Sequence, residues 1–255
     1  LTHMFGVPTN FLMMAQEPGF ADADLSHLMT LGIGGAAAPL ALIEDFAAKN
    51  IILQQGWGMT ETGPLGLLLS PDQTLAKVGS SGLPTMYVSL KICDATGAEV
   101  AKGGEGELMI KGPTVTPGYW NREAEHDDFF TADGWFHTGD VARQDEDGYY
   151  YIVDRTKDMY ISGGENVYPA EVENVIFEMD GVLENAVIGV PDEKWGEVGR
   201  ACIVLKPGSN LDEDAVIDHC NDKLARFKVP KQVRFMDELP HNATGKVLKH
   251  QIPRD

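Results

Sequence analysis

The stretch that decides the fold runs from Asp154 to Glu173 and reads Asp-Arg-Thr-Lys-Asp-Met-Tyr-Ile-Ser-Gly-Gly-Glu-Asn-Val-Tyr-Pro-Ala-Glu-Val-Glu. Four of its first five residues are charged, which is untypical of a buried strand. A β-prone run at 159–162 then leads into Gly163-Gly164. Pro169 suits a first helical turn, and apolar residues recur at helical spacing after it. The pattern predicts a charged joint, a strand, a glycine loop and a helix in succession.

The composition indicates a globular protein with a sizeable core in one or two domains, because 43% of the 255 residues are hydrophobic. No apolar run approaches the roughly 18 residues of a membrane span, so no stable membrane insertion is expected. The first residues lack the features of a signal peptide. The net charge of −19 argues against nucleic-acid binding. Scattered cysteines, Cys93, Cys202 and Cys220, indicate free thiols and a cytoplasmic location.

Residues 1–78 are predicted to belong to an α/β subdomain with a parallel sheet. Strands are expected at Leu28–Ile33 and Ile51–Gln55, and Pro39 opens a helix that ends near Asn50. Both strands run into glycine-containing segments. This order places a ligand-binding edge at the carboxyl ends of the strands.

The remainder of the chain is predicted to be richer in antiparallel strands. In residues 79–154, short alternating runs separated by Gly and Pro indicate a small, distorted β-barrel. Residues 155–255 are expected to form an α+β domain with a helix after Pro169. Its other expected elements are strands at 186–190, 201–205 and 232–236 and a helix at about 211–225.

A nucleotide-binding pattern follows the second predicted strand, at Gly56-Trp57-Gly58-Met59-Thr60-Glu61. The Trp57 ring can cover a purine face, Thr60 can donate to a phosphate, and Glu61 can hold Mg²⁺. A tight turn around a buried tryptophan explains the same spacing equally well.

Asp140 is a second candidate, in a predicted loop after Thr138-Gly139. A carboxylate there can accept hydrogen bonds from two vicinal hydroxyl groups. The simpler interpretation is an aspartate that serves its own turn. His137 is interpreted as scaffolding.

Basic residues gather near the C-terminal end in an otherwise acidic chain. Residues 223–249 contain seven Lys or Arg and two acidic residues, and Lys246 follows a Thr-Gly turn. An anionic ligand such as ATP or CoA needs positive charge of this kind. A solvated amphipathic helix and tail have a similar composition, and Arg155 and Lys157 likewise fit a solvated linker.

Together, these motifs resemble in order and spacing the adenylate-forming superfamily of acyl-CoA synthetases, luciferases and peptide-synthetase adenylation domains. The form is most similar to fatty and aryl acyl-CoA ligases, and the resemblance covers essentially the whole chain. It implies that a small-molecule carboxylate reacts with ATP to give acyl-AMP and pyrophosphate, with Mg²⁺, and that coenzyme A then forms the thioester. A mobile C-terminal domain would rotate about a hinge near 154–158 between the two steps.

The resemblance assigns roles to individual residues. Lys246 would bridge the substrate carboxylate and the α-phosphate, with Thr60 and Glu61 as the other catalytic groups and Glu61 as the magnesium ligand. Lys157 would be the hinge, and Gly163 and Gly164 would line the CoA tunnel. The implied nucleotide-binding residues are Gly34, Gly35, Ala36, Gly56, Trp57, Gly58, Met59, Thr60, Asp140, Ile152, Arg155 and Lys246.

One motif of the family is absent from this sequence, namely the Ser/Thr/Gly-rich phosphate loop that ends in Pro-Lys-Gly. The chain is therefore interpreted as the C-terminal half of a synthetase, inactive or weak by itself. By resemblance, His3–Pro8 and Gly32–Ala38 line one side of the acyl pocket, without deciding between fatty and aryl acids. The alternatives are a domain that loads a carrier protein, a nucleotide-binding regulatory half and a structural fragment. Homodimers are common among relatives, and the residues do not decide the oligomeric state.

Overall fold

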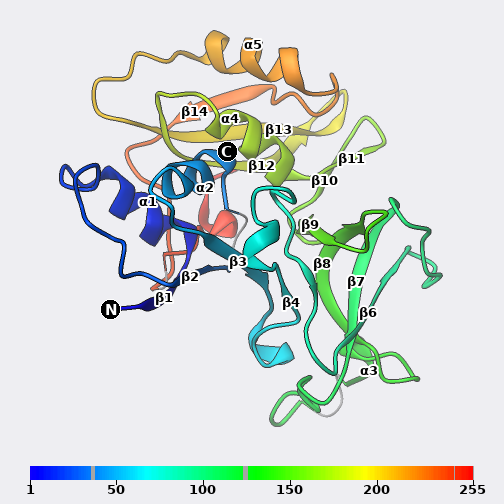
Figure 1. Ribbon diagram of the computed structural model, residues 1–255. Coiled ribbons are helices and arrows are strands. Elements are labelled where there is room, and N and C mark those ends of the chain that lie inside the picture. The colour runs from blue at the N-terminus through cyan, green and yellow to red at the C-terminus, as the bar shows by residue number, and fades with distance from the viewer. Residues whose placement is uncertain (36–37, 123–125, 244, 255) are drawn as a thin grey trace. The chain divides into compact units, whose positions relative to one another are not determined.

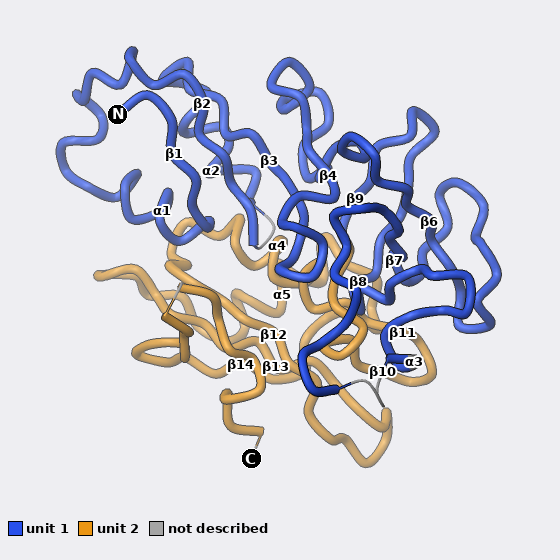
Figure 2. Tube along the Cα trace, turned by 90° about the horizontal axis from the view of Figure 1, so that it is seen from below, with its two compact units in different colours: residues 1–152 blue, residues 153–255 orange. Residues whose placement is uncertain are grey.

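The computed structural model describes residues 1–35, 38–122, 126–243 and 245–254. The chain forms two compact units, Leu1–Ile152 and Val153–Asp255, which Figure 2 shows in different colours. The boundary lies between Ile152 and Val153, one residue before Asp154, where the charged joint begins. The finer division into 1–78, 79–154 and 155–255 stays a prediction.

The first sheet of unit 1 begins with three parallel strands and ends with two short antiparallel ones. Helices α1 and α2 pack beside the parallel strands (Figure 1) around a core that includes Phe11, Leu31, Ile33 and Phe46. The expected parallel sheet and the helix after Pro39 are confirmed, whereas α1 and the first strand were not predicted. In sheet order, the strands are β1 (His3–Gly6), β2 (Thr30–Ile33), β3 (Leu53–Trp57), β4 (Leu67–Leu68) and β5 (Leu83–Pro84); the helices are α1 (Pro8–Gln16) and α2 (Leu40–Ala47).

The second sheet of unit 1 is open, so the prediction of a β-barrel was wrong. Its described strands follow the order β6-β7-β8-β9, which leaves β6 and β9 at opposite edges. Four strands are too few to enclose a packed barrel interior. The edge at β9 bonds instead to the segment before β5, through Tyr150 N–H to Gly82 O (3.0 Å) and Ser81 N–H to Tyr150 O (2.8 Å). The elements are β6 (Ser89–Cys93), β7 (Glu105–Lys111), β8 (Phe136–Gln144), β9 (Tyr150–Arg155) and the short helix α3 (His126–Phe129).

Unit 2 is an α+β unit, as expected. Its central strand β13 pairs with β12 along one side and with β10 and β14 along the other. Helix α5 lies next to β14 and β13 in Figure 1. The elements are β10 (Tyr160–Ser162), β11 (Glu165–Val167), α4 (Pro169–Phe177), β12 (Val182–Asp192), β13 (Gly196–Leu205), α5 (Glu213–Lys223) and β14 (Gln232–Phe235).

The two faces of this sheet bury different partners because side chains alternate along a strand. Val187, Ala201 and Ile203 pack with the apolar side chains of α4 and α5. Ala186 and the other residues of opposite orientation pack with the C-terminal segment, through Leu239, Val247 and Ile252. The sheet therefore lies between a helical layer and the segment that carries Lys246.

Two expectations about the chain as a whole can be compared with the described residues. All three cysteines are free and buried, which confirms the expected thiols. Among the described helices, none combines the length and the apolar character that a membrane crossing requires.

Candidate active site

The predicted glycine turns of unit 1 lie beside each other at the carboxyl ends of β2 and β3. A Cβ atom on Gly34 would lie 3.1 Å from Gly56 O, and Gly35 has a φ of +80°. Gly58 tolerates no side chain, because a Cβ there would lie 1.6 Å from Pro64 O. Glycine at these positions thus allows the backbones to approach one another closely. Ala36, the third residue of the first turn, lies outside the described residues.

Trp57 and Asp140 are joined directly, although 83 residues separate them. The indole Nε1–H donates to Asp140 Oδ2 at 2.7 Å, and the two residues are 8% and 5% exposed. Trp57 also belongs to one hydrophobic cluster with Met59 and Ile152. Four of the predicted nucleotide-binding residues therefore occupy one neighbourhood at the end of β3.

Asp140 lies within strand β8, so the expectation of a loop at this position was wrong. The register places residues 138–140 opposite the single residue Leu108 of β7, which makes a bulge. Thr138 Oγ1 donates to Leu108 O (2.5 Å), and Gly139, with a φ of +69°, donates its N–H to Glu107 Oε1 (3.1 Å). The bulge re-aims the strand and buries the Asp140 side chain.

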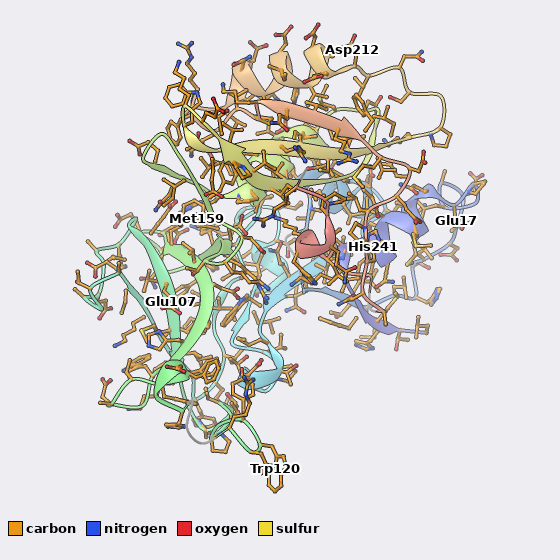
Figure 3. All side chains as sticks on the ribbon, turned by 180° about the vertical axis from the view of Figure 1, so that it is seen from behind. Glu17, Glu107, Trp120, Met159, Asp212 and His241 are labelled. Carbon is orange, nitrogen blue, oxygen red and sulfur yellow. The ribbon has the colours of Figure 1, made fainter. Side chains whose placement is uncertain are left out.

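Glu107 holds this bulge from the neighbouring strand. Its Oε2 lies 2.9 Å from His137 Nδ1, while its Oε1 accepts from Gly139. Figure 3 labels Glu107 on β7. His137 thus contacts a side chain that supports Asp140, which agrees with its interpretation as scaffolding.

The loop after β3 presents Glu61 on a short 3₁₀ turn, η1 (Thr60–Thr62). Thr62 Oγ1 accepts from Met59 N–H at 3.0 Å and fixes the start of the turn, while Thr60 is exposed. Glu61 Oε1 accepts from the Tyr119 hydroxyl at 2.8 Å. Burial, with the hydrogen bond to Glu61, raises the pKa of Tyr119 to about 12, so the phenol stays protonated and donates.

Two residues near these groups were not singled out from the sequence. Tyr119 lies 58 residues from Glu61, and no local pattern links them. Gln55 carries a readable signal, because strand alternation places this polar side chain on the buried face with Leu53 and Trp57. Its buried Oε1 has no hydrogen-bond partner among the described residues. An unpaired buried acceptor is costly, and a ligand donor at this strand end would satisfy it.

Magnesium would be held here by few protein atoms. Among the described residues, no group of three or more His, Cys, Asp or Glu is arranged to hold a metal ion. Glu61 offers one carboxylate, of which Tyr119 occupies Oε1. A single carboxylate together with substrate phosphates is an ordinary way to bind Mg²⁺, so the residue fits that ion.

The other predicted residues lie in unit 2. Arg155 ends β9 and Lys157 lies in the following turn. Gly163 and Gly164 form the two-residue turn between β10 and β11, with φ values of +62° and +90°. A turn with both central residues in this region is the type I′ hairpin, which explains the two glycines without a ligand. Trp195 packs against this turn, because a Cβ on Gly163 would lie 2.8 Å from its ring.

Lys246 lies in a closed loop of the C-terminal segment. Asn242 N–H donates to Lys246 O, and Lys246 N–H donates to Asn242 Oδ1, both at 2.9 Å. Leu248 N–H donates to Pro240 O at 2.7 Å and closes the base of the loop. Backbone and side-chain bonds together therefore fix the main chain at Lys246.

Carboxylates from another part of the chain offset some of the positive charge of residues 223–249. Lys228 pairs with Glu171 at 2.6 Å, Lys249 pairs with Glu173 at 2.7 Å, and Lys223 pairs with Glu178. All three carboxylates come from α4 or the residue that follows it. The seven basic residues are therefore not all available to an anionic ligand.

Two family models match parts of the chain, and relatives in two bacterial genera match nearly all of it. Residues 1–120 match the family model described as AMP-binding enzyme, and residues 171–246 match its C-terminal domain. A feruloyl-CoA synthase of Amycolatopsis sp is 45% identical over 254 residues, which are 100% of this chain and 52% of the relative. A long-chain-fatty-acid–CoA ligase, FadD13 of Mycobacterium tuberculosis, is 46% identical over 244 residues, 95% of this chain and 48% of the relative.

Solved structures also match over nearly the whole chain. The o-succinylbenzoate CoA synthetase of Bacillus subtilis, in complex with its acyl-adenylate intermediate, matches with a TM-score of 0.88 and 36% identity, over 99% of this chain and 51% of that one. ATP-bound MatB from Rhodopseudomonas palustris matches with a TM-score of 0.90 and 37% identity, over 98% and 50%. The chain thus spans about half the length of the relatives it matches.

Proposed function

The chain belongs to the AMP-binding enzyme family, and on that premise we propose that it is part of an ATP-dependent acyl-CoA synthetase. The observation that carries the proposal is the bond between Trp57 and Asp140, which puts an aromatic ring and a carboxylate at one strand end. The ring is suited to a purine, and the carboxylate is suited to the vicinal hydroxyls of a ribose. Solved relatives hold ATP or an acyl-adenylate.

The remaining nucleotide contacts follow from the same strand ends. Gly34, Gly56 and Gly58 let backbone segments come close together at these strand ends, and the main-chain groups of these segments are the proposed contacts for the base and phosphates. The unpaired Gln55 Oε1 is an acceptor for an exocyclic amino group. The Asp140 carboxylate is the proposed acceptor for the ribose hydroxyl groups.

In the first proposed step, the substrate carboxylate attacks the α-phosphorus of ATP and pyrophosphate leaves. Such transfers depend on positioning and on neutralising charge. Lys246 contributes an ammonium between the carboxylate and the α-phosphate. Mg²⁺, when bound beside Glu61, supplies further positive charge to the phosphate oxygens.

In the second proposed step, the CoA thiol loses its proton and attacks the acyl carbon, and AMP leaves with the electrons of the broken bond. Lys246 has no role in this step, so a rotation about Lys157 replaces it with the β10–β11 turn at Gly163-Gly164. The two half-reactions thus use opposite faces of one unit. The proposed acyl donors are fatty or aryl carboxylates, the classes that the names of the relatives indicate.

The test is thioester formation, followed by mass spectrometry, with ATP, Mg²⁺, CoA and a panel of fatty and aryl acids. The protein is the longest natural polypeptide that contains this chain, beside a Lys246→Met variant. We expect an acyl-CoA product whose mass names the acid, and its loss in the variant. AMP binding without any acyl-AMP or thioester would contradict the proposal and favour a nucleotide-binding module.

A further inference from the structure

The outer edge of β12 is closed by a side chain of helix α4. Strand β12 ends the sheet order on its side, which leaves outward-facing backbone groups to be satisfied. Glu173 Oε1 accepts from Val187 N–H at 2.7 Å, and Glu173 O accepts from Asn185 Nδ2 at 3.1 Å. The carboxylate therefore replaces a neighbouring strand at this point of the edge.

The same carboxylate holds the C-terminal segment through Lys249. Lys249 Nζ lies 2.7 Å from Glu173 Oε1, and the two side chains are only 17% and 20% exposed. Burial alone would lower the pKa of Lys249, but the carboxylates of Glu173 and Asp154 outweigh it and raise the pKa, so the ammonium stays charged. Both side chains are largely shielded from water, so the ion pair restricts the geometry of the two groups more than a pair on the surface would.

We call this pair, Glu173 and Lys249, the edge clip. It joins the two layers on opposite faces of the sheet, since α4 packs on one face and the C-terminal segment on the other. Lys249 begins the 3₁₀ turn η4 (Lys249–Gln251), directly after the bond from Leu248 N–H to Pro240 O. The clip is therefore the first side-chain anchor after the base of the Lys246 loop.

Helix α4 also contacts the charged joint. Asp154, which is 8% exposed, accepts from Ala170 N–H at the start of α4 (2.8 Å) and from Arg155 N–H (2.7 Å). The start of the helix is thus tied to the residues before Lys157, and its middle is tied to the segment after Lys246. One short helix connects both ends of the proposed moving unit.

We propose that Glu173 and Lys249 are positioning residues for Lys246, holding its loop at a fixed place relative to the joint. This rests on the proposed role of Lys246 in adenylation. The β10–β11 turn, proposed for the thioester step, is bonded through β13 and Trp195 and does not involve the clip. Loss of the clip should therefore impair the first half-reaction and spare the second.

The first test needs no enzymatic activity. Hydrogen exchange is measured on the 255-residue chain as wild type, Lys249→Met and Lys223→Met. Lys223 is the matched control, because it also pairs with a carboxylate near the end of α4 but lies in α5. We expect faster exchange over residues 241–252 in Lys249→Met alone. Unchanged exchange there, or equal acceleration throughout unit 2, would overturn the clip whatever the activity of the chain.

The second test separates positioning from mere stability in the longest natural polypeptide that contains this chain. Lys249→Met should lower carboxylate-dependent ATP–pyrophosphate exchange by about tenfold or more, and thioester formation from supplied acyl-AMP by less than about twofold. In Lys249→Met the Glu173 carboxylate is left without its cation. The double variant Glu173→Gln/Lys249→Met removes that carboxylate, so we expect it to recover the melting temperature without recovering ATP–pyrophosphate exchange. Recovery of both would reduce the pair to a structural role and overturn the proposal. A wild type without any ATP–pyrophosphate exchange activity would instead contradict the proposed function. The hydrogen-exchange test would still show whether the edge clip holds the C-terminal segment.

Discussion

Gly58 is the residue whose identity the backbone constrains most tightly. A Cβ atom would lie 1.6 Å from Pro64 O, so Gly58→Ala requires the loop before Glu61 to move. We expect a loss of about 3 kcal/mol in the free energy of unfolding, measured by urea denaturation. Gly19→Ala is the control, because nothing lies within 4 Å of a Cβ there. Similar stability of the two variants would mean that the loop adapts freely.

Trp57 acts as a hydrogen-bond donor as well as an apolar side chain. Trp57→Phe keeps most of the buried ring but removes the donor to Asp140 Oδ2. Leaving a buried carboxylate oxygen without this bond should cost about 1–3 kcal/mol and weaken AMP binding. Trp120→Phe is the matched control, since Trp120 is 90% exposed and projects away from the ribbon in Figure 3. An unaltered melting temperature in Trp57→Phe would contradict the structural role of the bond.

Cys220 makes the stability of the chain vary with pH in the alkaline range. Burial raises the pKa of its thiol from 9.0 to about 11. The folded state then holds the proton more tightly than the unfolded state, so stability is complete below pH 9 and falls as the pH rises towards 11. The loss over that window should be about 2–3 kcal/mol larger in the wild type than in Cys220→Ala. Parallel pH profiles of the two proteins in chemical denaturation would exclude this contribution.

The β10–β11 hairpin depends on its two glycines for different reasons. Gly164→Ala meets only the cost of a φ of +90°, about 1 kcal/mol, because no atom lies near its Cβ. Gly163→Ala adds a contact of 2.8 Å with the Trp195 ring and should be more destabilising. Thermal melts of both variants, alone and combined with Trp195→Ala, give the coupling free energy between each glycine position and the Trp195 ring. Equal losses, unaltered by Trp195→Ala, would show that the ring is not in contact.

Element prediction succeeded where the deciding signal is local. Pro169 and the apolar spacing after it placed α4, and the Gly-Gly pair placed a turn after β10, because both follow from neighbouring residues. Strand β11, which makes this turn a hairpin, was not predicted. Strand β8 was missed because Thr138-Gly139-Asp140 looks like a loop, and only contacts with Glu107 and Leu108 make it a bulged strand. Long-range hydrogen bonds of this kind leave no pattern within the segment itself.

The same limit applies to the whole molecule. The short alternating runs of residues 79–154 indicate strands, but they do not determine how many strands form or whether the sheet closes. The barrel prediction was wrong because the edge at β9 bonds to Gly82 and Ser81 and not to β6. More residues of the candidate site than of this sheet could be named in advance, because the site residues came from a family resemblance. What the sequence did not contain was the pairing of Trp57 with Asp140 and of Tyr119 with Glu61.

The claim that unit 1 carries an adenylate site is tested most directly by calorimetric titration of the 255-residue chain with AMP. We expect saturable binding of one AMP per chain. Asp140→Ala should weaken it by about tenfold or more, as removal of a charged hydrogen-bond acceptor does, while Trp120→Phe leaves it unchanged. Absence of binding by the wild type, or equal affinity in Asp140→Ala, would contradict the site.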